Sequence, residues 1–498
     1  MNVRDGLGVT QSGSHTVDVV IVGSGPAGAA VAVQTANAGL STLVIEEGPW
    51  LQPADYPSDG FTAMAKLYRD MGASVTRGRS PLPYLQGRAV GGTSVVNGAI
   101  SWRLPRDVHA TWTAADPALA EAWPWHTLDQ IFADLERDLH IAPTDAAIAG
   151  ANNKLFAKGA EALGIAHRPI ARNVRACLGA GQCLQGCPHG RKQSMDQSLL
   201  PRACHDGAQI WSNTKVNQIA HANGRATGVT ATTRGGATVH VRATKAVVLA
   251  ASAVQTPCLL WQSGLRHGPV GQGFQAHPGA SVAGFFAQEV ALWSGATQGH
   301  EAIGMRDQGL KFEALGMDIG LAASRLPGVG AALAHDLQRL PHLAEWGCAV
   351  KAQARGLVRP GLFGRPVVRY QLTPADIATT RKGIAVLAEM MLAAGAESVH
   401  PGVHGGPHHI SSGRDLGDFV ANGPADPRSY AMVLTHMFGT ARAGSDPASS
   451  VVRPDFRHHH IAGLYVADSS VFPSNTGVNP QTSILALATL CGRSVVAA

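Results

Sequence analysis

Three cysteines stand close together near the middle of the chain, at Cys177, Cys183 and Cys187, and a proline follows the last of them. Thiolates spaced in this way within a glycine-rich segment can hold an iron–sulfur cluster. Ala180 stands where a further cysteine would complete a Cys-x-x-Cys pair with Cys177, which disfavours a four-cysteine cluster. Zinc would need a fourth ligand, such as His189, in suitable geometry. The sequence leaves an iron–sulfur centre and structural thiols open, and we favour structural thiols.

Glycines that could bind phosphate groups stand near the N-terminus, in the spacing Gly23-x-Gly25-x-x-Gly28. The first permits a tight turn, the second lets the backbone approach a pyrophosphate, and the third lets a helix pack closely on a strand. The N-terminus of that helix offers free N–H groups to the phosphates. Glu46 follows near the distance at which an acid accepts from ribose hydroxyls and disfavours a 2′-phosphate. The spacing predicts a dinucleotide site without distinguishing FAD from NAD.

These glycines require a strand before them and a helix after them, and the sequence contains both. Val19–Val22 is a continuous apolar run typical of a strand buried on both faces. Ala27–Ala38 is rich in helix formers, and Leu43–Ile45 is a second buried strand. Val247–Ala250 leads into a turn and a helix, Ala251–Leu265, in the same manner. The pattern predicts an α/β fold with a parallel, Rossmann-like sheet.

The C-terminal segment repeats this pattern of a buried strand followed by a helix. Ile461–Val466 reads as a strand with Asp468 at its end, and Thr482–Val496 reads as a helix rich in Ala and Leu. We therefore expect the end of the chain to complete the first sheet, so that the dinucleotide domain is discontinuous. Residues 1–16 are expected to form a flexible arm.

Composition narrows the class of protein. The 498 residues are 45% hydrophobic and 15% charged, which indicates a globular protein of two or three domains. The net charge of +6 is scattered and contains no long basic run, so nucleic-acid binding is not expected. The chain shows no apolar core of a signal peptide at its start and no run of about 18 apolar residues. We expect a cytoplasmic protein without a membrane span.

A glycine-rich segment, Gln86–Arg103, completes a set of motifs that resembles the glucose–methanol–choline (GMC) family of FAD-dependent oxidoreductases. The resemblance rests on motifs in the order of the family: the first glycine motif with Glu46, Gly87-Arg88-x-x-Gly91-Gly92-Thr93-Ser94-x-x-Asn97-Gly98, Ala251–Leu265, His436-x-x-Gly439-Thr440, and Gly463–Asn479 with Pro480. It implies FAD as the cofactor. It also implies an FAD-binding domain of residues 1–110, 171–285 and 436–498 and an α+β substrate-binding domain of residues 111–170 and 286–435.

The resemblance also implies roles for single residues. Gly23, Gly25, Gly28 and Glu46 would hold the ADP half of FAD, and the backbone at Val216 would meet the adenine. Asp468 would lie near the ribityl chain and the pyrophosphate. The residues expected along the flavin and beside it are Gly91, Gly92, Ser94, Asn97, Asn479 and Pro480.

His436 and Asn479 are the catalytic pair that the resemblance implies. Oxidation of an alcohol requires removal of the hydroxyl proton and of a hydride from the same carbon, and the N5 atom of a flavin accepts the hydride. A histidine suits the proton and can hold the alcohol oxygen. Asn479 stands where many members have a second histidine, and its amide can donate to the same oxygen.

The resulting prediction is oxidation of a small-molecule alcohol to an aldehyde or ketone. The apolar content of residues 316–343 favours a hydrophobic alcohol. Oxygen, a quinone or a redox protein remain open as the electron acceptor. A flavin-dependent lyase or photodecarboxylase on the same fold is one alternative. A flavin-binding protein without catalysis, and an iron–sulfur dehydrogenase that passes electrons to a protein acceptor, are others.

Overall fold

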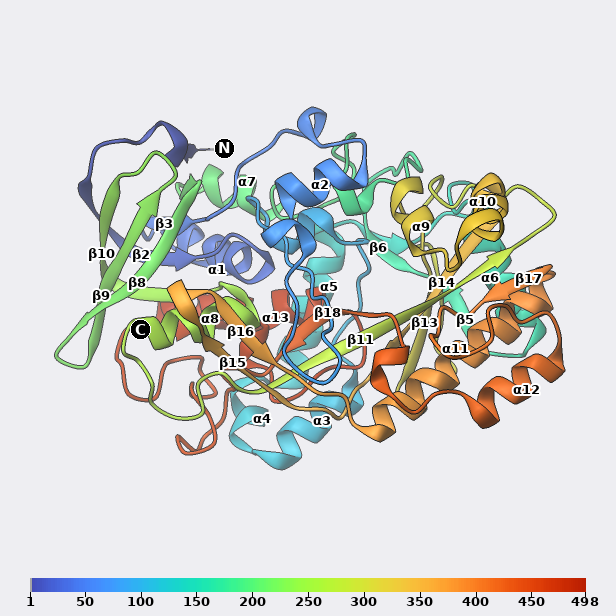
Figure 1. The fold of residues 1–498 in the computed structure, drawn as a ribbon. Coiled ribbons are helices and arrows are strands. Elements are labelled where there is room, and N and C mark those ends of the chain that lie inside the picture. The colour runs from blue at the N-terminus through green and yellow to red at the C-terminus, as the bar shows by residue number, and fades with distance from the viewer. Residues whose placement is uncertain (1) are drawn as a thin grey trace.

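The computed structural model describes residues 2–498 and consists of two halves, each built on one large sheet (Figure 1). No helix within residues 2–498 is long and apolar enough to cross a membrane. The first half has an eight-stranded sheet, with strand order β1-β7-β3-β2-β10-β9-β8 and with β19 also paired to β10. Its strands are β1 (Val3–Asp5), β2 (Gly13–Val22), β3 (Thr42–Ile45), β7 (Gln209–Ser212), β8 (Thr214–Ala222), β9 (Arg225–Thr233), β10 (Thr238–Leu249) and β19 (Leu464–Val466).

The centre of the first sheet is parallel, as the apolar runs predict. β2 pairs in parallel with β3 and β10, and β10 pairs in parallel with β19, whereas β8 and β9 are antiparallel. Val19, Val20 and Ile21 are fully buried, as expected of a central strand that is covered on both faces. The pairing of β19 with β10 confirms that the C-terminal segment completes this sheet.

The arm predicted for residues 1–16 is wrong for the residues described. β1 pairs in parallel with β7, and β2 already begins at Gly13. The backbone of this segment finds hydrogen-bond partners at the sheet edge, which fixes it in place.

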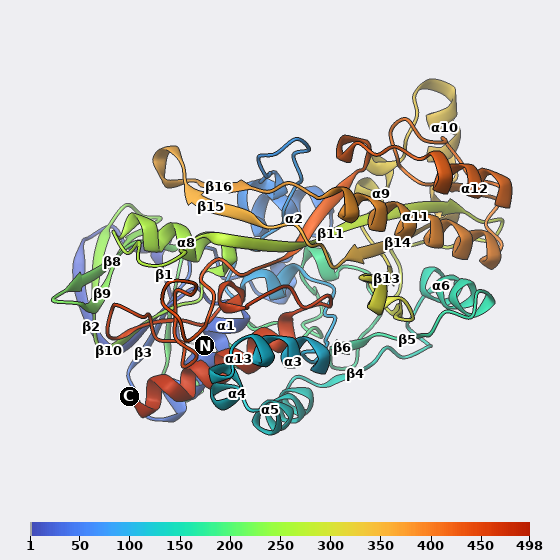
Figure 2. The ribbon, with the colours of Figure 1, turned by 90° about the horizontal axis from the view of Figure 1, so that it is seen from below.

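The second half has a nine-stranded antiparallel sheet. Its order is β16-β15-β11-β14-β13-β12-β5, and β17 and β18 also pair with β11. The strands are β5 (His167–Pro169), β11 (Gln272–Phe285), β12 (His300–Ala302), β13 (Leu310–Ala314), β14 (Leu343–Val350), β15 (Gly356–Pro360), β16 (Pro366–Arg369), β17 (Ser398–His400) and β18 (Met432–Phe438). A separate ribbon joins β4 (Ile141–Pro143) to β6 (Ala171–Asn173). The long strand β11 runs from the first half into the second in both views (Figures 1 and 2).

Helices flank both sheets. They are α1 (Pro26–Asn37), α2 (Gly60–Leu67), α3 (Arg106–Ala115), α4 (Ala118–Ala122), α5 (Trp125–Asp138), α6 (Ala151–Ala162), α7 (Leu199–His205), α8 (Ser252–Gln262), α9 (Ile319–Arg325), α10 (Gly330–Gln338), α11 (Pro374–Ala394), α12 (Gly413–Asn422) and α13 (Gln481–Ala497). α1 packs against α13, and α11 packs against α6 and β14. Each half thus has its own apolar core.

The residue boundaries of the two domains stay a prediction. Side chains of α3, α4 and α5, such as Trp112 and Phe132, belong to the core of the first sheet. β11 and β18 belong to the second sheet. The predicted boundary at residue 436 therefore falls within β18, where the two halves meet.

Candidate active site

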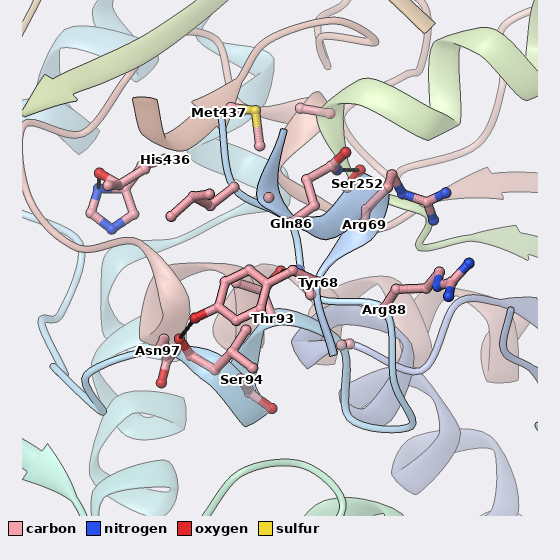
Figure 3. A pocket seen from close by; sticks show the side chains of 18 of the residues that line it. Tyr68, Arg69, Gln86, Arg88, Thr93, Ser94, Asn97, Ser252, His436 and Met437 are labelled. Carbon is pink, nitrogen blue, oxygen red and sulfur yellow. Dashed lines mark hydrogen bonds between the residues drawn. The ribbon is translucent and has the colours of Figure 1, made fainter. Parts of the chain in front are cut away.

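One cavity of about 1090 Å³ runs between the two halves. This volume exceeds that of a usual site for a single small ligand, about 300–1,000 Å³. The predicted residues that line it are Gly23, Gly25, Glu46, Gly92, Ser94, Asn97, Val216, His436, Asp468, Asn479 and Pro480. The structure therefore brings together residues from both ends and the middle of the sequence. Figure 3 shows His436 on one side of the cavity, Arg69 and Arg88 on the other, and Asn97 and Ser94 below.

Gly28 and Gly91 do not line the cavity, but they shape its wall. A Cβ atom at Gly28 would lie 1.9 Å from the carbonyl oxygen of Gly23, so only glycine lets α1 pack this closely on the turn after β2. Gly91 has a φ of 101° and precedes Gly92. A Cβ atom at Gly92 would lie 2.7 Å from the Cα atom of Gly25. The two glycine motifs thus touch through bare backbone.

Glu46 closes the first turn. It is buried, and its carboxylate accepts hydrogen bonds from the amide and hydroxyl of Ser24 at 3.1 and 2.8 Å and from the amide of Gly48 at 2.8 Å. Burial raises the pKa of Glu46 although these hydrogen bonds act in the opposite direction. A carboxylate can accept about four hydrogen bonds, so Glu46 retains capacity toward the cavity.

Basic side chains, of which the motifs include only Arg88, also line this end of the cavity. Arg69 pairs with Glu47 at 2.7 Å, and Arg88 and Lys215 lie in the same wall. Burial acts to raise the pKa of Glu47, but the guanidinium of Arg69 lowers it overall. Arg69 and Lys215 lie outside the motifs, and a single basic residue carries no recognisable signal in one sequence, so only the fold could reveal them as neighbours of Arg88.

Asp468 stands just after β19 and links the end of that strand to α8 and to the turn at Ser470. Its carboxylate accepts from the amide of Ser252 at 3.0 Å, from the hydroxyl of Thr256 at 2.5 Å and from the amide of Ser470 at 2.9 Å. Burial raises its pKa in spite of these donors. It therefore fixes the start of α8 against the cavity.

The walls fit a dinucleotide such as FAD. α1 begins at Gly25 without a side-chain cap, and α13 begins at Pro480 without one, so both helices present N-terminal N–H groups at the cavity. At the start of α13, the amide nitrogen of Gln481 and the hydroxyls of Thr482 and Ser483 are buried and lack a partner among residues 2–498. Phosphates and the polar atoms of a flavin can satisfy such groups.

His436 lies on β18 beside a second histidine that the motifs do not include. The Nδ1 atoms of His436 and His277 are 3.1 Å apart, and the amide of Gly477 donates to Nε2 of His277 at 3.0 Å. Because Nε2 of His277 accepts, the proton of that ring stays on Nδ1 and is donated to His436. Burial lowers the pKa of His277 to about 3. Burial, with added effects of His277 and Lys311, lowers the pKa of His436 well below 6.5.

Asn479 is held by a buried lysine, Lys311. The Lys311 ammonium, which is 1% exposed, donates to Oδ1 of Asn479 at 2.9 Å. It also pairs with Glu301 at 2.8 Å and with Glu313. An ammonium only donates hydrogen bonds, so it selects the amide orientation in which Nδ2 of Asn479 points away from Lys311. Asn479 therefore offers a donor, in agreement with the role expected of it.

The three clustered cysteines do not form a metal site. No group of three or more His, Cys, Asp or Glu side chains within residues 2–498 is placed to hold a metal ion. The Sγ atoms of Cys177 and Cys187 accept from the nearby amides of Gly179 and Arg191. The iron–sulfur interpretation is therefore not supported.

Cys183 has its own environment. It is buried, and Arg172 donates to its Sγ atom at 3.2 Å. Burial acts to raise the pKa of this thiol, but Arg172 and Lys192 lower it overall. Structural thiols stay our prediction for these cysteines.

Comparison with known proteins agrees with this geometry. Two sequence profiles described as GMC oxidoreductase match residues 64–279 and 356–488, and one described as FAD dependent oxidoreductase matches residues 18–51. An uncharacterized GMC-type oxidoreductase of Mycobacterium tuberculosis is 38% identical over 485 residues, which cover 96% of this chain and 76% of the relative. The chain belongs to the GMC oxidoreductase family. The predicted family, fold class and FAD cofactor are confirmed.

One more distant relative and one solved structure are also similar to this GMC oxidoreductase. A long-chain-alcohol oxidase of Arabidopsis thaliana is 26% identical over 532 residues, covering 97% of this chain and 67% of the relative. Among solved structures, a variant of formate oxidase from Aspergillus oryzae, studied for FAD modification, has a TM-score of 0.74 at 18% identity and covers 97% of this chain and 98% of that one. At this identity the structural likeness shows the fold alone.

Proposed function

We propose that this GMC oxidoreductase oxidises an alcohol to an aldehyde or ketone, with His436 as the proton acceptor and Asn479 as a donor to the alcohol oxygen. FAD supplies a hydride acceptor at N5 of its flavin when it is bound. The observation that carries the proposal is the presence, in one cavity, of a half-buried histidine with a lowered pKa and of an amide whose Oδ1 is held by Lys311, so that its NH₂ group is turned away from the lysine. The long-chain-alcohol oxidases among the relatives support the same reaction class.

His436 meets the first requirement of a proton acceptor, because a ring with a lowered pKa is neutral near pH 7. Its contact with His277 adds a condition. Nε2 of His436 can accept a proton only when the proton between the two Nδ1 atoms belongs to His436. His277 must then give up its hydrogen bond from Gly477. We expect the two rings to change tautomer together when the alcohol binds: the proton between the Nδ1 atoms passes to His436, His436 releases its Nε2 proton to water, and His277 takes a proton from water at Nε2, so that both rings stay neutral.

Asn479 meets the second requirement. Negative charge grows on the alcohol oxygen as its proton leaves, and a donor already in place stabilises that charge without reorganising. Lys311 supplies this preorganisation by holding Oδ1. The chain's own residues thus bind the oxygen, orient it and take its proton.

The deciding experiment is anaerobic mixing of the FAD-loaded protein with a panel of primary and secondary alcohols, followed by the visible absorbance of the flavin. Bleaching by an alcohol, with release of the aldehyde or ketone, is the expected result. Absence of bleaching with every alcohol class would refute the proposal and favour a lyase or photodecarboxylase. Repeating the assay in air, with a quinone and with a redox protein identifies the acceptor, for which oxygen is our expectation from the oxidases among the relatives.

A further inference from the structure

The cavity extends past His436 and Asn479 to a second polar cluster on the sheet of the other half. Ser281 of β11, Arg325 of α9 and Glu345 of β14 all line it. Nη2 of Arg325 donates to the hydroxyl of Ser281 at 3.1 Å, and Nε of Arg325 lies 3.3 Å from the carboxylate of Glu345. The Glu345 side chain is only 3% exposed, while that of Arg325 is 37% exposed.

Strand register places this cluster on the same sheet face as His277, the neighbour of His436. Residues of one strand that are two apart share a face, so His277, Gly279 and Ser281 form one row along β11. Gly279 pairs with Ala349 and Val433, and Ser281 pairs with Gly347. At about 3.3 Å per residue, Ser281 lies on the order of 13 Å from His277.

The floor between the two ends is open and its walls are apolar. Gly279 and Gly347 carry no side chains and both line the cavity. A Cβ atom at Gly347 would lie 2.7 Å from Cδ1 of Leu315, so Leu315 packs over β14 here, whereas at Gly279 on β11 a Cβ atom would meet nothing closer than 3.6 Å. Leu315, Met317 and Leu321 form the neighbouring wall. This stretch suits a hydrocarbon chain, and Glu313, a charged side chain in the same wall, is paired with Lys311.

The charge of the cluster selects the group it can bind. One cation and one carboxylate cancel, which leaves a neutral site that both donates and accepts. A carboxylate would meet Glu345, and an amine would meet Arg325. A hydroxyl can accept from Arg325 or Ser281 and donate to Glu345 at the same time.

We propose that this second cluster, Ser281 with Arg325 and Glu345, binds a second hydroxyl of the substrate, so that the enzyme acts on aliphatic diols whose two hydroxyls are on the order of 13 Å apart. This inference rests on the proposed function, because it takes His436 as the place of reaction. It specifies the substrate class: a long alkane chain with a hydroxyl at each end.

The experiment compares alkanediols with mono-alcohols of equal length, such as decanediol with hydroxyls at both ends against decanol, together with hexanediol and tetradecanediol. Flavin reduction under anaerobic conditions gives the apparent dissociation constant and the limiting rate for each. Hydrogen bonds to charged groups of this kind change affinity by about tenfold or more. We expect decanediol to bind at least about tenfold more tightly than decanol, with similar limiting rates, and the shorter and longer diols to lose this advantage.

Three variants test the residues. Ser281→Ala and the charge-balanced pair Arg325→Met with Glu345→Gln should remove most of the diol preference and leave decanol almost unchanged. Arg414→Met, at an exposed position on α12, is the matched control and should alter neither substrate. The Ser281→Ala change removes one oxygen, so it keeps the test valid if the double variant fails to fold.

The outcomes separate the two proposals. If decanol bleaches the flavin but decanediol binds no more tightly, or if the variants weaken both substrates equally, the second hydroxyl site is refuted and alcohol oxidation stands. If no alcohol bleaches the flavin, the proposed function fails and the diol site fails with it.

Discussion

Asn479→Asp should slow flavin reduction strongly while leaving the fold intact. The aspartate has the shape of the asparagine and gives Lys311, which now donates to Oδ1 at 2.9 Å, an anionic partner in the same place. The variant replaces the free NH₂ donor by an oxygen that repels the charge growing on the substrate. Loss of one such donor costs about 10²–10³ in rate, or about 3–4 kcal/mol of transition-state stabilisation.

The same reasoning predicts a smaller effect at Lys311. Lys311→Met alone would leave the carboxylate of Glu313 without its cation, whereas Glu301 would keep Arg168 at 2.8 Å, and breaking a buried pair destabilises a protein by about 3–5 kcal/mol. Lys311→Met combined with Glu313→Gln removes one charge of each sign. Asn479 then loses the contact that orients its amide, which we expect to slow reduction by about tenfold, since a hydrogen bond to a charged group is worth about 1.5–3 kcal/mol.

A double-mutant cycle tests whether Lys311 acts through Asn479. The rate of flavin reduction is measured by anaerobic stopped-flow absorbance for the Lys311→Met/Glu313→Gln variant, for Asn479→Ala and for their combination. Removal of Lys311 should cost nothing further once Asn479 is alanine, because there is no amide left to orient. Glu313→Gln alone and Lys382→Met, an exposed position on α11, serve as controls. Independent, additive losses from Lys311 and Asn479 would refute this account of the lysine.

Other predictions follow from the same cavity. His436→Gln should slow flavin reduction by about 10²–10⁴ with FAD still bound, as measured by stopped flow and by the flavin spectrum. Because the pKa of His436 is lowered, the neutral form is lost only as pH falls well below 6.5, so the reduction rate should stay level from about pH 6.5 to 8 and decline in acid; a decline centred near pH 6.5 would contradict the half-buried, neutral ring. Gly28→Ala should abolish FAD retention, since its Cβ would lie 1.9 Å from Gly23, whereas Gly417→Ala on α12 meets nothing within 4 Å and should retain FAD. The purified protein should contain no iron, and Cys177→Ser and Cys187→Ser should keep the flavin spectrum and activity; iron by elemental analysis would overturn the assignment of the thiols.

The dinucleotide end of the cavity could be predicted because its signals are local. Gly23, Gly25 and Gly28 stand within one turn, and each has a reason to be glycine that follows from backbone geometry alone. The buried runs at Val19–Val22 and Val247–Ala250 identify their strands for the same reason. The expectation of a flexible N-terminal arm failed because pairing of β1 with β7 is a contact between distant segments.

The residues that orient the chemistry could not be predicted. Lys311 and Glu313 alternate with apolar residues in β13, a pattern that normally indicates a strand with one face in water. Here that face is turned inward, and register sets Lys311 opposite Ala349 and Glu313 opposite Gly347. His277 likewise sits in an ordinary strand pattern. Lys311, Glu313 and His277 owe their roles to contacts across the sheet, and a single sequence contains no direct signal of such contacts.

β11 joins these observations into one physical picture. Its row His277, Gly279, Ser281 supplies in turn the partner of the proton acceptor, an open floor and a donor of the second polar cluster. Side chains alternate along a strand, so a slip of one residue would turn all three away from the cavity. The bulge that admits His436 lies on β18, where the four residues from Leu434 to Met437 face the three residues of β11 from Pro278 to Ala276. β11 has a bulge of its own at Gln272–Phe274, against β15, but it lies outside the segment from His277 to Ser281. The spacing between the reacting end and the far end of the cavity is therefore set by the pitch of one strand.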